Sequence, residues 1–121
     1  MTFWLTAGVA ILGGLGAVGR FIVHSWIVRA DRLEFPLATF AVNVAGSFGV
    51  GLLAGIGAGH GPRLLLGTGV FGAFTTFSTW MFETERMAVD GQAGGAARNL
   101  ATGVAAGFGA LALGVWLGGM I

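Results

Sequence analysis

Hydroxyl and aromatic side chains alternate along residues 72–80, where the sequence reads GAFTTFSTW. This stretch lies within an apolar run from about Leu64 to Phe82 that is long enough to cross a membrane. Ser and Thr side chains compete for backbone hydrogen bonds, so the cluster favours an interruption of the helix near mid-depth. Irregular backbone is tolerated inside a membrane only where protein covers it or a polar cavity meets it. We therefore expect the freed carbonyls and hydroxyls to form a site.

A second polar stripe is predicted on the span that follows Pro36. Thr39, Asn43 and either Ser47 or Gly46 recur at helical spacing on an otherwise apolar segment, and so they share one face. Asn43 serves either as an interhelical hydrogen-bonding group or as an amide donor facing the path of an anion. Its place beside an interrupted span favours the second interpretation.

Two charged residues stand where they could act on a passing ion. Arg20 falls within the first span, where it either has a function or reaches the membrane surface along its aliphatic stem. Glu83 follows the hydroxyl cluster, and it either lines a vestibule or is a solvated helix end. No carboxylate lies deep within a span, so a proton-coupled cation exchanger would lack its coupling group.

The elements that position these residues are predicted to be four transmembrane helices. The chain has 121 residues, of which 55% are hydrophobic and only 9% are charged, which is typical of an integral membrane protein. The apolar runs cover roughly residues 3–28, 37–58, 64–87 and 97–119, and the short connections leave a single all-α domain, 1–121. The first run lacks the features of a cleaved signal peptide and is expected to remain as a span.

Glycine spacing predicts close helix packing. Small residues four apart let membrane helices approach one another, and three pairs have this spacing: Gly51/Gly55, Gly103/Gly107 and Gly114/Gly118. Four helices of this size do not enclose a wide aqueous channel, so we expect an oligomer with its functional path near the subunit interface.

The distribution of arginine indicates an orientation. Arg29 and Arg32 lie in the first connection and Arg86 and Arg98 flank the third, whereas only Arg63 lies in the second. The positive-inside rule then places the first and third connections in the cytoplasm and both termini outside.

The composition excludes several classes of protein. The sequence has no cysteine, no catalytic constellation, no metal-binding His cluster and no basic surface for nucleic acid, so an enzyme is not expected. The polar groups within the spans are hydroxyls, an amide, aromatic edges and one guanidinium. These groups suit a small anion, because hydroxyls, amide N–H groups and ring edges can replace its water.

Three motifs together resemble the Fluc (CrcB) fluoride channels. They are residues 13–21 (GGLGAVGRF), residues 38–47 (ATFAVNVAGS) and residues 72–79 (GAFTTFST) with Glu83 downstream, in family order and at family spacing. The resemblance implies a bacterial plasma membrane protein, a dimer of four-helix subunits inserted antiparallel to each other. It also implies passive export of fluoride through two pores at the subunit interface, and a structural sodium ion on the dimer axis.

Roles carry over to individual residues by motif position. Gly72 and Thr75 would give backbone oxygens to sodium, and Arg20 and Glu83 would attract anions or line a vestibule. The expected fluoride pathway comprises Asn43, Phe77, Trp80, Ser78, Thr79, Thr39 and Phe74.

Two departures from the family pattern stand out. Trp80 occupies the place of a second pore phenylalanine, where its size and N–H group would reshape the pore, and Gly103, Ala106 and Gly107 replace polar residues on the last span. These departures raise a heterodimer with a paralogous subunit as an alternative to a homodimer. Two further alternatives are a non-conducting partner subunit and a small multidrug exporter, although such exporters need a glutamate that the first span lacks.

Overall fold

A computed structural model describes residues 2–30 and 35–121, and these residues form helices without any strand. Arg32, which the orientation argument used, lies outside the described residues. Four helical segments are long and apolar enough to cross a membrane, as the sequence predicted: Phe3–Ala30, Leu37–Gly55, His60–Val89 and Ala93–Gly119.

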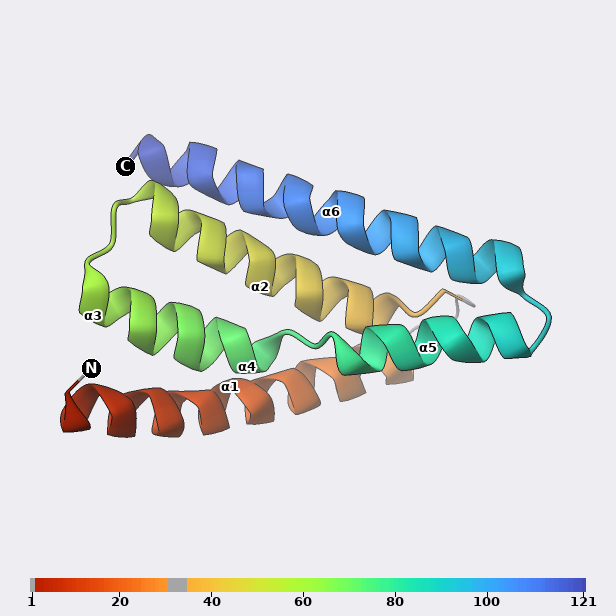
Figure 1. Cartoon of the computed structure of the whole chain (residues 1–121), viewed down its shortest axis with the longest axis horizontal. Helices are drawn as coiled ribbons and strands as arrows, with labels where there is room; N and C mark the ends of the chain where they lie inside the picture. Colours follow the sequence, from red (N-terminus) through yellow and green to blue (C-terminus); the bar gives the residue numbers. More distant parts are fainter. Residues whose placement is uncertain (1, 31–34) are drawn as a thin grey trace.

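The segments lie side by side as four long rods, with both termini at the same end (Figure 1). The first is α1 (Phe3–Ala30), the second α2 (Leu37–Gly55) and the fourth α6 (Ala93–Gly119). The third rod is composite, and its parts are α3 (His60–Pro62), the π-helix η1 (Arg63–Phe71), α4 (Gly72–Phe74) and α5 (Ser78–Val89). It packs against α1 and α2 through η1 and against α6 through α5.

The pairing of α2 with α6 is built on the glycines whose spacing predicted close packing. A Cβ atom on Gly51 would collide with the backbone of Leu111, and one on Gly114 would collide with the backbone of Phe48. Gly55 and Gly118 make a similar approach one turn further on. The two helices therefore touch backbone to backbone, which only residues without a side chain permit.

Glycines on α2 also allow the third rod to pack closely against this helix. A Cβ atom on Gly46 would meet the side chain of Thr75, and one on Gly49 would lie 2.5 Å from ring atoms of Phe71. This face of α2 thus holds the third rod close, at the level where its helix is interrupted.

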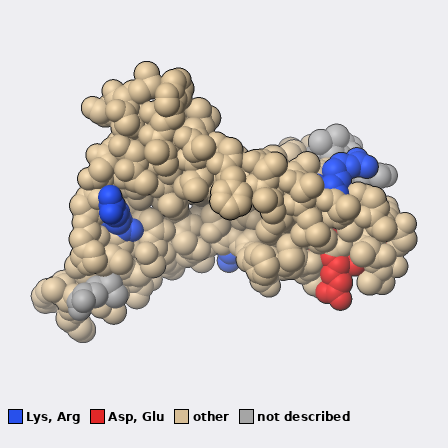
Figure 2. All heavy atoms as spheres, turned by 45° about the horizontal axis from the view of Figure 1, so that its top comes forward, with Lys and Arg blue, Asp and Glu red and all other residues tan. Residues whose placement is uncertain are grey.

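Charged side chains gather toward the two ends of the molecule on the face shown in Figure 2, and the middle of that face is almost free of them. An uncharged band between charged ends is what a bilayer requires of a protein that spans it. The described helices and this band indicate a multi-pass membrane protein.

Candidate functional site

The helix of the third rod stops at Phe74 and resumes at Ser78. Thr75 has φ −82° and ψ 160°, which is extended rather than helical backbone. Its hydroxyl donates back to the carbonyl of Phe71 over 3.2 Å. Threonine side chains commonly compete in this way with backbone N–H groups for a carbonyl of the preceding turn. Residues 75–77 consequently present backbone groups that the helix would otherwise use.

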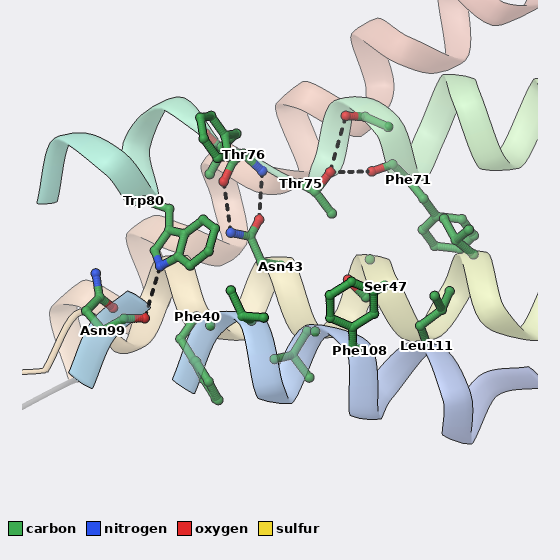
Figure 3. A pocket seen from close by; sticks show the side chains of 18 residues that line it. Phe40, Asn43, Ser47, Phe71, Thr75, Thr76, Trp80, Asn99, Phe108 and Leu111 are labelled. Carbon is green, nitrogen blue, oxygen red and sulfur yellow. Dashed lines mark hydrogen bonds between the residues drawn. The ribbon is translucent and has the colours of Figure 1, made fainter. Parts of the chain in front are cut away.

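Asn43 on α2 takes up the backbone groups of Thr76 (Figure 3). Its Nδ2 donates to the Thr76 carbonyl over 2.8 Å, and its Oδ1 accepts from the Thr76 N–H over 2.7 Å. In a continuous helix that N–H would bond to the carbonyl of Gly72, four residues earlier. The side chain of Asn43 therefore substitutes for helical hydrogen bonding, and its amide keeps one N–H for another acceptor.

Thr76 also organises the start of α5. Its Oγ1 accepts from the backbone N–H of Thr79 over 3.2 Å, as helix-capping hydroxyls do, and donates to Thr79 Oγ1 over 3.1 Å. The positive end of the α5 dipole consequently lies beside the interruption.

Arg20 reaches the same segment from α1. Its Nη1 donates to the carbonyl of Thr75 over 2.9 Å, across 55 positions of sequence. The guanidinium therefore binds protein rather than extending only toward the membrane surface, and it places a positive charge next to the interruption.

A cavity of about 430 Å³ opens between α2, the interrupted segment and α6 (Figure 3). Its walls are mainly apolar, and its polar groups come from the interruption and from facing residues of α2 and α6. Among the lining residues are Asn43, Ser47, Gly72, Thr75, Thr76, Phe77, Trp80, Asn99, Gly103 and Phe108.

Two aromatic rings of the third rod meet at this cavity. Phe77 and Trp80 pack edge to face, with ring centroids 5.9 Å apart and planes at 81°. The indole N–H of Trp80, which the sequence expected to reshape the pore together with the size of the ring, donates to the carbonyl of Asn99 on α6 over 3.1 Å.

Thr39 and Glu83 form a second polar contact, away from the cavity. Thr39 is only 1% exposed, and its hydroxyl donates to Glu83 Oε1 over 2.7 Å. The other oxygen, Oε2, is buried and has no hydrogen-bond partner among the described residues. Glu83 is therefore held by α2 and is not simply a solvated helix end.

The remaining predicted site residues lie outside the cavity. Ser78 is exposed and Thr79 is half-buried, and neither lines the cavity. Phe74 lies close to α1, since a Cβ atom on Gly19 would be 3.8 Å from its ring.

Sequence reasoning missed the parts played by Thr76 and Asn99 at the cavity. Thr76 was seen only as one hydroxyl of the cluster, and its contact with Asn43 spans 33 positions. Asn99 stood near the start of an apolar span, where a buried amide is itself a signal of a specific partner.

Comparison with known proteins assigns the family. Residues 7–115 match the family described as "CrcB-like protein, Camphor Resistance (CrcB)". The chain belongs to the CrcB family. This CrcB chain is 41% identical over 117 residues to a protein of Mycobacterium bovis named "Fluoride-specific ion channel FluC 2", which covers 97% of the chain and 93% of that protein.

Two further CrcB relatives carry similar names. "Fluoride-specific ion channel FluC 1" of Leifsonia xyli subsp. xyli is 44% identical over 127 residues, covering 99% of this chain and 90% of that protein. "Fluoride-specific ion channel FluC 2" of Bacillus cereus is 46% identical over 79 residues, covering 65% and 67%. The names describe ion channels and not enzymes.

Proposed function

We propose that this chain is a subunit of a fluoride-selective channel that exports fluoride passively across the bacterial plasma membrane and so lowers cytoplasmic fluoride. One observation carries the proposal: the third rod is interrupted between Phe74 and Ser78, and the interruption lines a cavity together with Asn43 and Phe77. The named relatives, which are called fluoride-specific ion channels, support the choice of ion.

The chemistry of the cavity suits a small, strongly hydrated anion. The remaining N–H of Asn43 and the positive edges of the Phe77 and Trp80 rings can replace its water. The start of α5 adds a favourable dipole, and half-helix N-termini serve anions in other transport proteins. Apolar walls keep the path narrow, which favours selectivity over throughput.

The charged and hydroxyl residues outside the cavity are proposed to line the routes by which the ion enters and leaves the cavity. Arg20 gives a positive potential beside the interruption, and the Thr39–Glu83 contact, which lies outside the cavity, is assigned to a vestibule. Ser78 and Thr79 offer further hydroxyls at the start of α5.

A second subunit is proposed to complete the path. The cavity opens on one side of the chain, where Phe77 is 69% exposed and Phe108 is 70% exposed. An antiparallel copy would cover these rings at mid-membrane, either in a homodimer or in a heterodimer with a paralogue. The numbered names of the relatives, FluC 1 and FluC 2, are compatible with pairs of genes.

A sodium ion on the dimer axis is proposed as the structural cofactor. The chain offers backbone carbonyl oxygens of the type that bind such a cation. The carbonyl of Gly72 has lost its helical N–H partner, because the Thr76 N–H donates to Asn43, and it accepts a long bond of 3.4 Å from the Thr75 hydroxyl. The carbonyl of Thr75 keeps one lone pair beside its bond to Arg20. Oxygen donors suit a hard cation, and two per chain are too few, so both subunits must contribute.

Fluoride efflux from liposomes tests the function. Vesicles that contain the protein and are loaded with fluoride should lose it, while chloride-loaded vesicles should not. Phe77→Ile should abolish fluoride efflux without changing assembly, because it removes the ring edge and keeps apolar bulk.

The same experiment separates the alternatives. Efflux only after co-expression with a paralogue identifies a partner-dependent subunit, and no fluoride efflux in either case refutes the proposal. Proton-driven uptake of an organic cation would instead support the multidrug exporter.

A further inference from the structure

The indole of Trp80 is held by a residue on the neighbouring helix rather than left free in the cavity. Its Nε1 donates to the carbonyl of Asn99 over 3.1 Å, as the dashed line in Figure 3 shows. The lining of the cavity is otherwise mainly apolar, with Val104 and Phe108 among the residues of α6. An indole N–H turned away from Asn99 toward an apolar wall would lose its acceptor at a considerable cost in free energy.

Gly103, one turn after Asn99, gives the ring its space. A Cβ atom at this position would lie 2.5 Å from Cζ2, 2.7 Å from Cε2 and 2.8 Å from Nε1 of Trp80. Real Cβ contacts are essentially never that short, so any larger residue would push the ring away. The absence of a side chain at Gly103 therefore determines how near the ring lies to α6.

Asn99 is itself fixed by α5. It is 2% exposed, and its Nδ2 donates to Thr84 Oγ1 over 2.8 Å. Thr84 is 8% exposed, and its hydroxyl donates to the carbonyl of Trp80 over 2.8 Å. Trp80, Asn99 and Thr84 thus form a closed circuit of hydrogen bonds between α5 and α6.

We propose that Asn99 and Gly103 are positioning residues for Trp80, which lines the ion path with its ring and does not donate its N–H to the ion. The proposal rests on the function proposed for the cavity. Trp80 acts as a wall whose distance from Asn43 and Phe77 is set by α6. The glycine at 103 is consequently a determinant of pore width, and Thr84 ties the side chain of Asn99 to the backbone of Trp80.

Proton NMR of the indole N–H groups tests the orientation of Trp80 without any measurement of transport. The protein has four tryptophans, and the resonance that Trp80→Phe removes is that of Trp80. Adding fluoride to the purified full-length protein should leave this resonance in place. A saturable downfield shift, larger than for the other three tryptophans, would overturn the proposal, because it would mean that the N–H donates to the anion.

Thr84 gives a matched pair of variants for the same measurement. Thr84→Val removes the hydroxyl that joins Asn99 to Trp80, and it should shift the Trp80 indole resonance and speed its exchange with water. Thr84→Ser retains the hydroxyl and should leave both nearly as they are. Equal spectra for the two variants would contradict the hydrogen-bond circuit.

A double-mutant cycle tests the role in conduction. Gly103→Ala should lower fluoride efflux about tenfold or more in the native background, a change of roughly 1.4 kcal/mol in barrier. It should have a much smaller effect beside Trp80→Phe, because phenylalanine lacks the atoms that the new methyl would meet. Gly109→Ala is the control, since nothing lies within 4 Å of a Cβ atom there. Equal effects of Gly103→Ala in both backgrounds would overturn the proposal.

Failure of this inference is distinguishable from failure of the proposed function. A native protein that releases no fluoride refutes the function, whereas the NMR measurements still decide how Trp80 is held. A conducting protein that tolerates Gly103→Ala refutes only the inference. Thermal melting of each variant separates loss of efflux from loss of folding, and the Thr84 pair remains decisive if Gly103→Ala does not fold.

Discussion

A single side chain, that of Asn43, makes the interrupted backbone possible. It satisfies both the N–H and the carbonyl of Thr76, which would otherwise be unpaired in a mainly apolar environment. The two interpretations of Asn43 from the sequence are therefore compatible, since one side chain makes the interhelical bonds and retains an N–H at the cavity.

Replacement of Asn43 should reduce both stability and transport. Asn43→Ala leaves two backbone groups of Thr76 without partners, and it should lower the free energy of unfolding by about 2 kcal/mol. Equilibrium unfolding in mixed micelles measures this loss. Ser47→Ala, at the same cavity and on the same helix, is the control and should change stability by less than about 0.5 kcal/mol. Similar losses for both variants would contradict the argument.

Arg20 joins the first rod to the interruption. Arg20→Gln keeps a donor for the Thr75 carbonyl but removes the positive charge, so folding should be largely retained while fluoride efflux falls. The efflux of the variant should also depend less on ionic strength than that of the native protein, because the charge attracts the anion. An unchanged efflux with unchanged salt dependence would show that Arg20 is structural only.

At the scale of the elements, the glycine contacts decide how near α2 and α6 lie. Neither helix carries a charge that pairs with the other, and the backbone approach supplies much of their packing. This spacing also sets the width of the cavity, because α2 and α6 form two of its sides.

A methyl group at this contact should therefore separate the helices. Gly114→Ala should lower the free energy of unfolding by about 1–3 kcal/mol, since overpacking forces the backbone to shift. The same exchange at Gly109, on the same helix, meets nothing and should be nearly neutral. Thermal melting in detergent compares the two variants, and equal melting temperatures would show that the contact does not limit packing.

For the whole molecule, the open side of the cavity predicts a dimer. The mass of the protein in detergent, measured by light scattering and corrected for bound detergent, should be twice the 12.3 kDa of one chain. A monomer that conducts fluoride would contradict the proposed interface. A chain that becomes dimeric and active only with a paralogue would identify the heterodimer.

Removal of sodium should weaken this dimer. Exchange of sodium for N-methylglucamine leaves the carbonyl oxygens of Gly72 and Thr75 without a cation, so the melting temperature and the dimer fraction should fall. Restoration by sodium but not by the organic cation would support the proposed ion. Unchanged melting and unchanged mass would count against it.

Local sequence was sufficient for the helical elements and for the segment where the third rod is interrupted. Runs of apolar residues predicted four membrane-length helices, and the glycine spacing predicted close helix packing without identifying which helices would meet. The hydroxyl cluster at residues 74–79 pointed to the segment where helical structure is absent at Thr75. These features depend on residues that are close in sequence. The length of an apolar run, the spacing of residues on one helix face and the bonding of a threonine hydroxyl to the preceding turn are all local properties.

The partners of the polar groups were decided only by the tertiary structure. The sequence indicated that the Trp80 N–H is a donor but not which acceptor it meets, and the structure brings the Asn99 carbonyl of α6 to it. Likewise, Thr76 meets Asn43 across 33 positions. An apolar pattern says how long a helix is and which face is buried, but it does not say which donor meets which acceptor. That choice depends on how far the helices slide and rotate against one another, and in this chain backbone contacts at glycines set both.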